Sequence, residues 1–153
     1  MKPDKVQHKV FEDSRGVFIP IPLGDREWNQ VNVVLNPNKF TLRGIHYQTN
    51  PPQTKYIKVV KGEILDILYD LNTGEVFCIT LGTEDALLIG SNFAHGYLTL
   101  EKDTIVTYLT EGAYSPNSER SIVWNTIPEI KNTILKIVEE NTLTISDKDM
   151  YGK

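Results

Sequence analysis

Short apolar segments recur along the first 124 residues, and clusters of Gly, Pro, Asn, Asp and Ser separate them. Segments of this length, with a turn about every eight to twelve residues, are typical of strands in an all-β sandwich or barrel. The sequence therefore predicts strands over residues 5–12, 17–23, 28–35, 63–71, 76–81, 86–89, 96–100, 104–110 and 121–124, in addition to a central pair within 42–63.

Helical periodicity is found only near the C-terminus. Ile130, Ile134, Ile137 and Val138 follow a helical spacing, which predicts a helix over residues 128–140 that ends at Asn141. Residues 145–149 are polar and resemble a capped helix start. In the segment 17–23, Pro20 and Pro22 cannot donate to a strand ladder. We therefore expect that segment to form an edge strand or an extended arm.

The central pair of strands places basic side chains close together. Residues 42–63 read as two strands joined by a turn that Pro51 and Pro52 stiffen. Side chains alternate between the two faces of a strand, so Lys55 shares a face with Ile57 and Val59. A charged residue on an apolar face is seldom fully buried without a partner. Lys55 is therefore a candidate site residue.

The first strand of the pair adds Arg43 and His46. By alternation, His46 shares a face with Leu42, Gly44 and Gln48, and Arg43 lies on the opposite face. Both side chains can point into one pocket only if the strand bulges, and Gly44 is the natural position for a bulge. The predicted pocket would combine a histidine, an arginine and a lysine, which suits proton transfer beside an anion.

Composition limits the class of protein. The chain has 153 residues, which predicts one domain over 1–153. A net charge of −4 without a basic run argues against nucleic-acid binding. Cys78 is the only cysteine, so no internal disulfide is expected. The N-terminus has no apolar signal region and no apolar run approaches the ~20 residues of a membrane span. We therefore expect a cytoplasmic protein without membrane contact.

Eight short motifs occur in one order along the chain. They are DSRGVF at 13–18, LRGIHYQ at 42–48, PPQTK at 51–55, VKGE at 60–63, NFAHG at 92–96, YSPNSE at 114–119, WN at 124–125 and SDKD at 146–149. In this combination the chain resembles the dTDP-4-dehydrorhamnose 3,5-epimerase family. The resemblance implies a cupin-type jelly roll, a homodimer that shares its N-terminal strands, a nucleotide-diphosphate sugar as substrate, and no cofactor or metal.

The resemblance also implies roles for individual residues. His46 matches the general base, Asp149 its paired carboxylate, and Tyr108 the proton donor on the opposite face of the sugar. Lys55 and Arg43 match residues around the sugar carbonyl and the diphosphate. Tyr114 matches an aromatic that stacks on the base, and Arg15 a residue that reaches the nucleotide from the neighbouring subunit. Further substrate contacts are implied for Gln30, Asn32, His95, Glu119 and Lys148.

Two departures from the family pattern leave the nucleotide open. Pro20 stands where the family has Glu, and Val31 stands where it has Asp. Both lie in the part that contacts the nucleotide. The reaction itself would be proton abstraction next to a C4 ketone, which suits a histidine base because its pKa lies near neutral pH. The sequence does not decide between inversion at C3 alone and at C3 and C5.

Three other functions compete with an epimerase. A metal-dependent cupin such as a dioxygenase needs several histidines and a carboxylate, whereas this chain has three histidines, no His-x-His and a lysine in the predicted site. A 3,4-ketoisomerase on a similar sugar typically has a second histidine where Gln48 stands. A non-catalytic sugar-binding jelly roll would retain the pocket alone.

Overall fold

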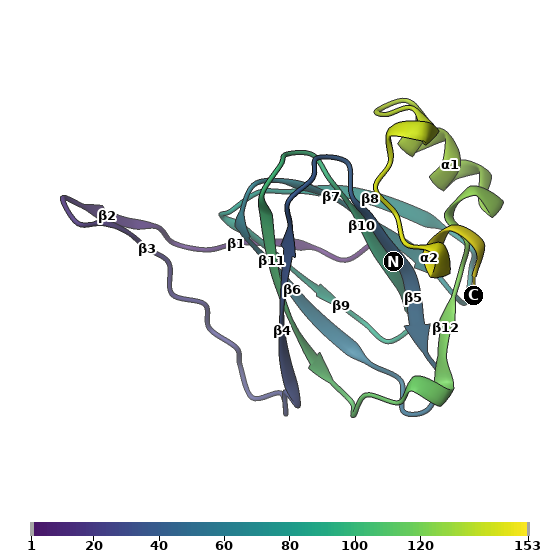
Figure 1. The fold of residues 1–153 in the computed structure, drawn as a ribbon. Helices are drawn as coiled ribbons and strands as arrows, with labels where there is room; N and C mark the ends of the chain where they lie inside the picture. Colours follow the sequence, from purple (N-terminus) through teal and green to yellow (C-terminus); the bar gives the residue numbers. More distant parts are fainter. Residues whose placement is uncertain (1, 153) are drawn as a thin grey trace.

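Two five-stranded sheets form the body of the protein in the computed structural model, which describes residues 2–152 (Figure 1). The first sheet has the order β1 (Lys5–Gln7), β9 (Asp85–Ile89), β6 (Thr54–Lys61), β11 (Thr104–Glu111) and β4 (Gln30–Asn36). The second has the order β12 (Glu119–Ser121), β5 (Leu42–Gln48), β10 (Phe93–Thr99), β7 (Ile64–Asp70) and β8 (Val76–Leu81). Neighbouring strands in both sheets are antiparallel.

The main core lies between the two sheets. Strands β6 to β11 each contribute residues from one face, as expected for pleated strands with one apolar face. Aliphatic and aromatic side chains fill this layer, namely Ile57, Val59, Ile64, Leu68, Ile79, Leu81, Leu87, Ile89, Phe93, Tyr97 and Val106. The predicted all-β jelly roll is confirmed, including a short helical segment at the C-terminal end.

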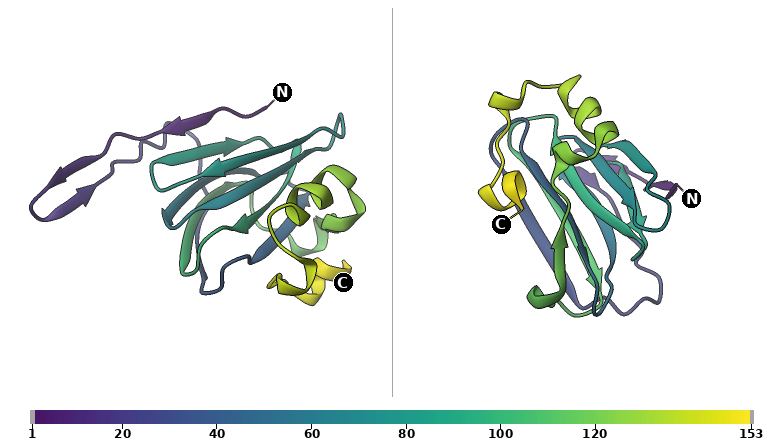
Figure 2. Two further views of the ribbon diagram at one scale, coloured as in Figure 1. Left: turned by 90° about the horizontal axis from the view of Figure 1, so that it is seen from above. Right: turned by 90° about the vertical axis from the view of Figure 1, so that its right-hand side faces the viewer.

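A second apolar layer covers the outer face of the second sheet. Helix α1 (Pro128–Leu135) lies over this face (Figure 2). Its side chains Ile130 and Ile134 are both fully buried. Trp124 is also fully buried in this layer, together with the strand residues Leu42 and Ile45. Pro128 begins the helix because its fixed φ and missing N–H suit the first helical position. The C-terminal segment is thereby fixed against the second sheet.

Strand β5 contains the predicted irregularity. His95 of β10 is opposite His46, but Tyr97 is opposite Arg43, so β5 has one more residue than β10 between these pairs. Gly44 lies within this bulge with φ +102°, a conformation that favours glycine. The bulge turns Arg43 and His46 toward the same side of the sheet, where both line one cavity.

Several predicted boundaries are wrong. The segment 5–12 is divided into β1 and β2 (Phe11–Asp13), and 17–23 holds only β3 (Gly16–Phe18) before the proline-containing arm. Of the predicted strand 121–124, only Ser121 belongs to β12, and Trp124 begins a 3₁₀ turn (Trp124–Thr126). Strand β10 begins at Phe93, three residues before the prediction of 96–100. Helix α1 ends at Leu135, and a 3₁₀ turn (Glu140–Thr142) follows.

The N-terminal hairpin of β2 and β3 projects away from the two sheets (Figure 1). Its apolar side chains face solvent in the single chain, with Phe11, Val17 and Phe18 between 54% and 67% exposed. In the described part of the chain, no helix has the length and apolar character needed to cross a membrane.

Candidate active site

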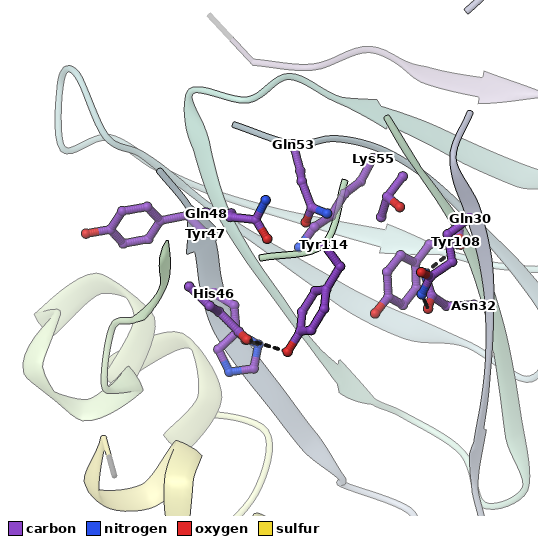
Figure 3. A pocket seen from close by; sticks show the side chains of 11 residues that line it. Gln30, Asn32, His46, Tyr47, Gln48, Gln53, Lys55, Tyr108 and Tyr114 are labelled. Atoms are coloured by element: carbon purple, nitrogen blue, oxygen red, sulfur yellow. Dashed lines mark hydrogen bonds and ion pairs between the residues drawn. The ribbon is translucent and has the colours of Figure 1, made fainter. Parts of the chain in front are cut away.

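A cavity opens between the two sheets and has two adjoining compartments. The first compartment, of about 250 Å³, is lined by Gln30, Asn32, His46, Tyr47, Gln48, Gln53, Lys55, Tyr108, Thr110, Tyr114 and Glu119. The second compartment, of about 140 Å³, is lined by Val34, Arg43, Gly44, His46, Lys55, His95, Gly96, Tyr97, Tyr108 and Asp149. His46, Lys55 and Tyr108 belong to both linings, and they therefore mark the middle of the site (Figure 3).

His46 is paired with Asp149. Its Nε2 lies 2.6 Å from Asp149 Oδ1, and Asp149 Oδ2 accepts a hydrogen bond from the Gly44 N–H at 3.1 Å. Burial alone would raise the pKa of Asp149, but the bonds from His46 and Gly44 and the positive charges nearby hold it below its usual value. An ionised carboxylate can only accept, so Nε2 carries the proton and donates it to Asp149. The lone pair of Nδ1 is then free for a substrate proton.

Helix α2 (Asp147–Tyr151) brings Asp149 to this position. Ser146 caps the helix, because its Oγ accepts a hydrogen bond from the Asp149 N–H at 3.2 Å. Gly152 ends the helix in the left-handed conformation with φ 75°. Residues 145–149 thus form the capped helix start that the sequence indicates. The capping bond goes to the backbone N–H of Asp149, the residue whose carboxylate pairs with His46.

Tyr108 faces His46 across the cavity (Figure 3). Tyr108 belongs to β11 (Thr104–Glu111), and its partly buried side chain borders both compartments. Burial raises the pKa of Tyr108, while the positive charge of Arg43 lowers it. The net shift is upward, so the phenol is protonated at neutral pH and has a proton to give.

Lys55 lines the cavity together with His46 and Tyr108, and its Nζ lies 5.9 Å from the centroid of the Tyr108 ring. Burial lowers the pKa of Lys55, and the negative charges of Asp66 and Glu119 oppose that shift. In its protonated form the side chain can stabilise a negative charge that develops in the cavity.

Glu119 connects the rim of the first compartment to His46. Its carboxylate accepts from the Tyr114 hydroxyl at 3.1 Å and from Lys148 Nζ at 3.2 Å, and it lies 3.8 Å from His46 Nδ1. Burial would raise the pKa of Glu119, but the bond from Lys148 and the charge of His46 outweigh it and lower that pKa. Tyr114 itself is 60% exposed, so its ring is available at the mouth of the cavity.

A second histidine–carboxylate pair lies beneath the site. His95 Nε2 is 2.6 Å from Asp66 Oδ1, and Asp66 is completely buried. Burial raises the pKa of Asp66, and the charges of His95 and Lys55 oppose this shift. The pair supports the cavity floor next to Lys55.

The structure brings together most of the residues predicted from the sequence. His46, Lys55 and Tyr108 line both compartments, and Arg43, His95 and Asp149 line the second. Gln30, Asn32, Tyr114 and Glu119 line the first, and Lys148 reaches its edge through Glu119. Arg15 is the exception. It lies on the projecting hairpin, pairs with Asp13 at 2.6 Å and lines neither compartment of its own chain.

Sequence reasoning misses several contributing residues, among them Asp66, Asn36 and Tyr97. Asp66 does leave a signal, since it is an acidic residue within the apolar strand 64–70. Asn36 and Tyr97 leave no comparable signal, although Asn36 bonds to Tyr97 and to Arg43. Among residues 2–152, no cluster of His, Cys, Asp or Glu side chains is arranged to hold a metal ion. Independence from metals and cofactors stays a prediction.

These groups suit the removal and return of a proton on opposite faces of a bound molecule. His46, with its orientation fixed by Asp149, is a base, and protonated Tyr108 is an acid. Lys55 can balance a negative charge that forms between them.

Known proteins with sequences similar to this chain share one description. A family model described as dTDP-4-dehydrorhamnose 3,5-epimerase matches residues 5–153. The enzyme of that name from Pseudomonas aeruginosa is 33% identical over 169 residues, which cover 99% of this chain and 91% of the relative. A relative of the same name from Neisseria gonorrhoeae is longer, and the chain spans 40% of its length at 33% identity.

Solved structures agree with this placement. A Legionella pneumophila dTDP-6-deoxy-D-glucose-3,5-epimerase in complex with dTDP-4-keto-L-rhamnose has a TM-score of 0.82 at 25% identity, over 95% of this chain and 83% of that one. A 3'-monoepimerase from Streptomyces bikiniensis in complex with dTDP-quinovose has a TM-score of 0.83 at 25% identity, over 96% and 80%.

Proposed function

The chain belongs to the dTDP-4-dehydrorhamnose 3,5-epimerase family, a family of isomerases, and from this premise we propose that it inverts C3, or C3 and C5, of a nucleotide-linked 4-keto-6-deoxy sugar. The observation that carries the proposal is the central trio of the cavity. The Asp149-paired His46 and the protonated Tyr108 face one space, and Lys55 borders the same space.

The first step is proton removal. The C4 ketone acidifies the hydrogens on C3 and C5, and His46 Nδ1 takes one of them. As the C–H bond breaks, its electron pair forms a carbon–carbon double bond to C4, and the carbonyl pair moves onto O4. Lys55, which borders the same space, stabilises the resulting enolate in its protonated form, because a positive charge already in place needs little reorganisation when the negative charge develops.

The second step is proton return from the other side. The enolate collapses to the ketone as the same carbon takes the phenolic proton of Tyr108, and the configuration of that carbon is inverted. The product leaves with a proton that came from Tyr108. Afterwards His46 gives its proton to water and Tyr108 regains one, so no net atom is gained or lost.

The first compartment holds the nucleotide end of the substrate in this proposal. Its lining offers amide groups from Gln30, Asn32 and Gln53, and Tyr114 presents its ring at the mouth. Such groups can hydrogen-bond and stack on a base. We expect a thymidine nucleotide, as in the related complexes. The departures at Pro20 and Val31 make this the least constrained part of the substrate.

Incubation with dTDP-4-keto-6-deoxyglucose tests the function. Proton NMR of the products should show an inverted centre at C3, or at both C3 and C5. A 3-keto sugar would identify a ketoisomerase, and unchanged sugar would identify a binding protein. Both results would refute the proposal. Turnover should be the same with and without EDTA, and loss on chelation followed by recovery with a divalent ion would refute metal independence.

Three expectations from the sequence remain predictions. The homodimer would allow Arg15 of the hairpin, which lies away from its own cavity, to reach the site of a second copy. The cytoplasmic location, which was expected because the sequence has no apolar signal region and no membrane-length apolar run, stays a prediction. The organisation of residues 1–153 as a single domain also stays a prediction.

A further inference from the structure

Asn36, at the end of β4, is the middle residue of a hydrogen-bonded series that runs from Arg43 to Tyr97, two residues that line the second compartment. Its Oδ1 accepts from Arg43 Nε at 2.7 Å. Its Nδ2 donates to the Thr104 carbonyl at 3.2 Å and to the Tyr97 hydroxyl at 3.4 Å. We propose that Asn36 is a positioning residue that holds the Arg43 guanidinium in the compartment that Tyr108 also borders, and thereby supports proton return. This proposal rests on the proposed function, in which Tyr108 is the acid.

Burial makes Asn36 a rigid anchor. Only 1% of its surface is exposed, and its amide contacts a strand carbonyl and a tyrosine that is 3% exposed. Arg43, in contrast, is exposed and has many rotamers. A short bond from a cation to a buried amide oxygen is among the stronger hydrogen bonds in proteins. It fixes Nε and leaves the two terminal nitrogens of the guanidinium for the cavity.

The position of Arg43 matters electrostatically for Tyr108. Both side chains line the second compartment, and among the charged groups Arg43 has the largest effect on the pKa of Tyr108, which it lowers. A phenol that gives up its proton becomes a phenolate, and a fixed cation nearby favours that change. The other titratable groups in the lining of the two compartments are His46, Tyr47, Lys55, His95, Tyr97, Tyr114, Glu119 and Asp149.

Asn36 itself lines neither compartment, so it acts through Arg43 and not on the substrate. Two consequences distinguish this role from a general contribution to folding. Loss of the anchor should slow inversion but not proton removal by His46. It should also leave the affinity for the nucleotide alone unchanged, because the first compartment would be intact.

The test compares Asn36→Leu with the wild-type protein on dTDP-4-keto-6-deoxyglucose in D₂O. We expect the rate of inversion to fall roughly tenfold or more, as part of the ~10²–10⁴-fold effect of general acid catalysis. Deuterium exchange into the unreacted sugar and the Kd of dTDP should stay at their wild-type values. The alkaline limb of kcat should move to higher pH, because the pKa of Tyr108 rises when Arg43 is no longer held beside it.

A double-mutant cycle excludes a merely structural effect. In an Arg43→Met background, Asn36→Leu should cause no further loss of inversion, because Asn36 acts through Arg43. Asn38→Ala is the matched control, since Asn38 is exposed on the following turn and the variant should invert at the wild-type rate. If Asn36→Leu melts below the assay temperature, the shorter Asn36→Ser, which cannot reach Arg43, replaces it.

Three results would overturn the proposal. They are wild-type inversion in both Asn36 variants, losses that simply add in the double mutant, and a raised Kd for dTDP with unchanged kcat. The last result would mean that Asn36 positions Arg43 to bind the diphosphate and not to assist proton return. Absence of exchange in the wild-type protein would instead refute the proposed function.

Discussion

His46 lies close to two carboxylates that come from distant parts of the chain. Asp149 bonds to Nε2 at 2.6 Å, whereas Glu119 lies 3.8 Å from Nδ1 and is already bonded to Lys148 and Tyr114. Because only Asp149 is within hydrogen-bonding distance, Nε2 is the donor to a carboxylate and Nδ1 is the nitrogen that can act as the base. Asp149 fixes the tautomer, and the side near Glu119 opens to the cavity.

Asp149→Asn should reverse that tautomer. The variant amide can keep the Gly44 N–H bond with its oxygen, but its NH₂ then faces His46 Nε2 and donates to it. The imidazole proton moves to Nδ1 and blocks the base. We expect kcat, measured by NMR of the products, to fall on the order of 10²-fold or more.

The same substitution has an expected effect on acid stability. Because the folded-state pKa of Asp149 lies below its unfolded value of about 3.9, its stabilisation is fully present above that pH and is lost as pH falls through the folded-state pKa. Thermal melting should therefore show that Asp149→Asn lowers Tm near neutral pH and that the difference from wild type shrinks below about pH 4. A constant difference at all pH values would contradict the assigned pairing.

At the scale of single elements, the bulge in β5 and the short helix α2 place the groups of the second compartment. Gly44 at φ +102° turns Arg43 and His46 to one side, and its N–H also bonds to Asp149. Helix α2 contains five residues, so its position depends on its caps and on the contact with β5.

Gly44→Ala should disturb the site and the fold together. A Cβ at this position would lie 2.7 Å from both the Gly96 Cα and the His95 carbonyl oxygen, in addition to backbone strain of ~1–3 kcal/mol. We expect a clear loss of Tm and of turnover. Gly82→Ala is the matched control, because its nearest atom is a comfortable 3.7 Å away. Equal tolerance of both substitutions would contradict the bulge.

Ser146→Ala should affect turnover more than global stability. Loss of an N-cap costs about 1 kcal/mol, and here the lost bond is to the backbone N–H of Asp149. We expect kcat to fall several-fold with only a small change in Tm. Ser146→Asp keeps a capping oxygen and should restore most of the rate. An equal loss of kcat in both variants would mean that the cap does not place Asp149.

Residue alternation, turn residues and one glycine were enough to predict most of these elements and the inward direction of Lys55. They could not predict that Asp149 meets His46, because a contact across 103 positions depends on how the C-terminal segment folds back. That pairing came only from the family resemblance. The early end of helix α1 at Leu135 and the division of segment 5–12 were also missed, because packing overrides local pattern at element ends.

For the whole molecule, the sheet sandwich leaves two apolar surfaces uncovered. The hairpin exposes Phe11 and Phe18, and the outer face of edge strand β4 exposes Val31, Val33 and Leu35, of which the least exposed is 61% accessible. Apolar surface of this extent at a sheet edge commonly marks a protein–protein interface. Both surfaces fit the expected homodimer with paired N-terminal strands.

Sedimentation at micromolar concentration should give twice the mass of one 17.4 kDa chain. Phe18→Ser should shift the protein toward monomer, because it removes the more exposed of the two hairpin phenylalanines. Arg15→Ala should leave the dimer intact but weaken nucleotide binding, if Arg15 reaches the neighbouring site. A wild-type monomer under these conditions would contradict the homodimer.

The most direct test of the two-faced site is deuterium uptake from D₂O by variants of the protein on a 4-keto nucleotide sugar, followed by NMR. His46→Ala should abolish both exchange and inversion, since no proton leaves. Tyr108→Phe should still exchange deuterium into C3 or C5 while inverted product forms ~10²–10⁴-fold more slowly. Tyr151→Phe, at an exposed tyrosine, serves as the matched control and should behave as wild type. Inversion by Tyr108→Phe at the wild-type rate would contradict the assignment of Tyr108 as the acid.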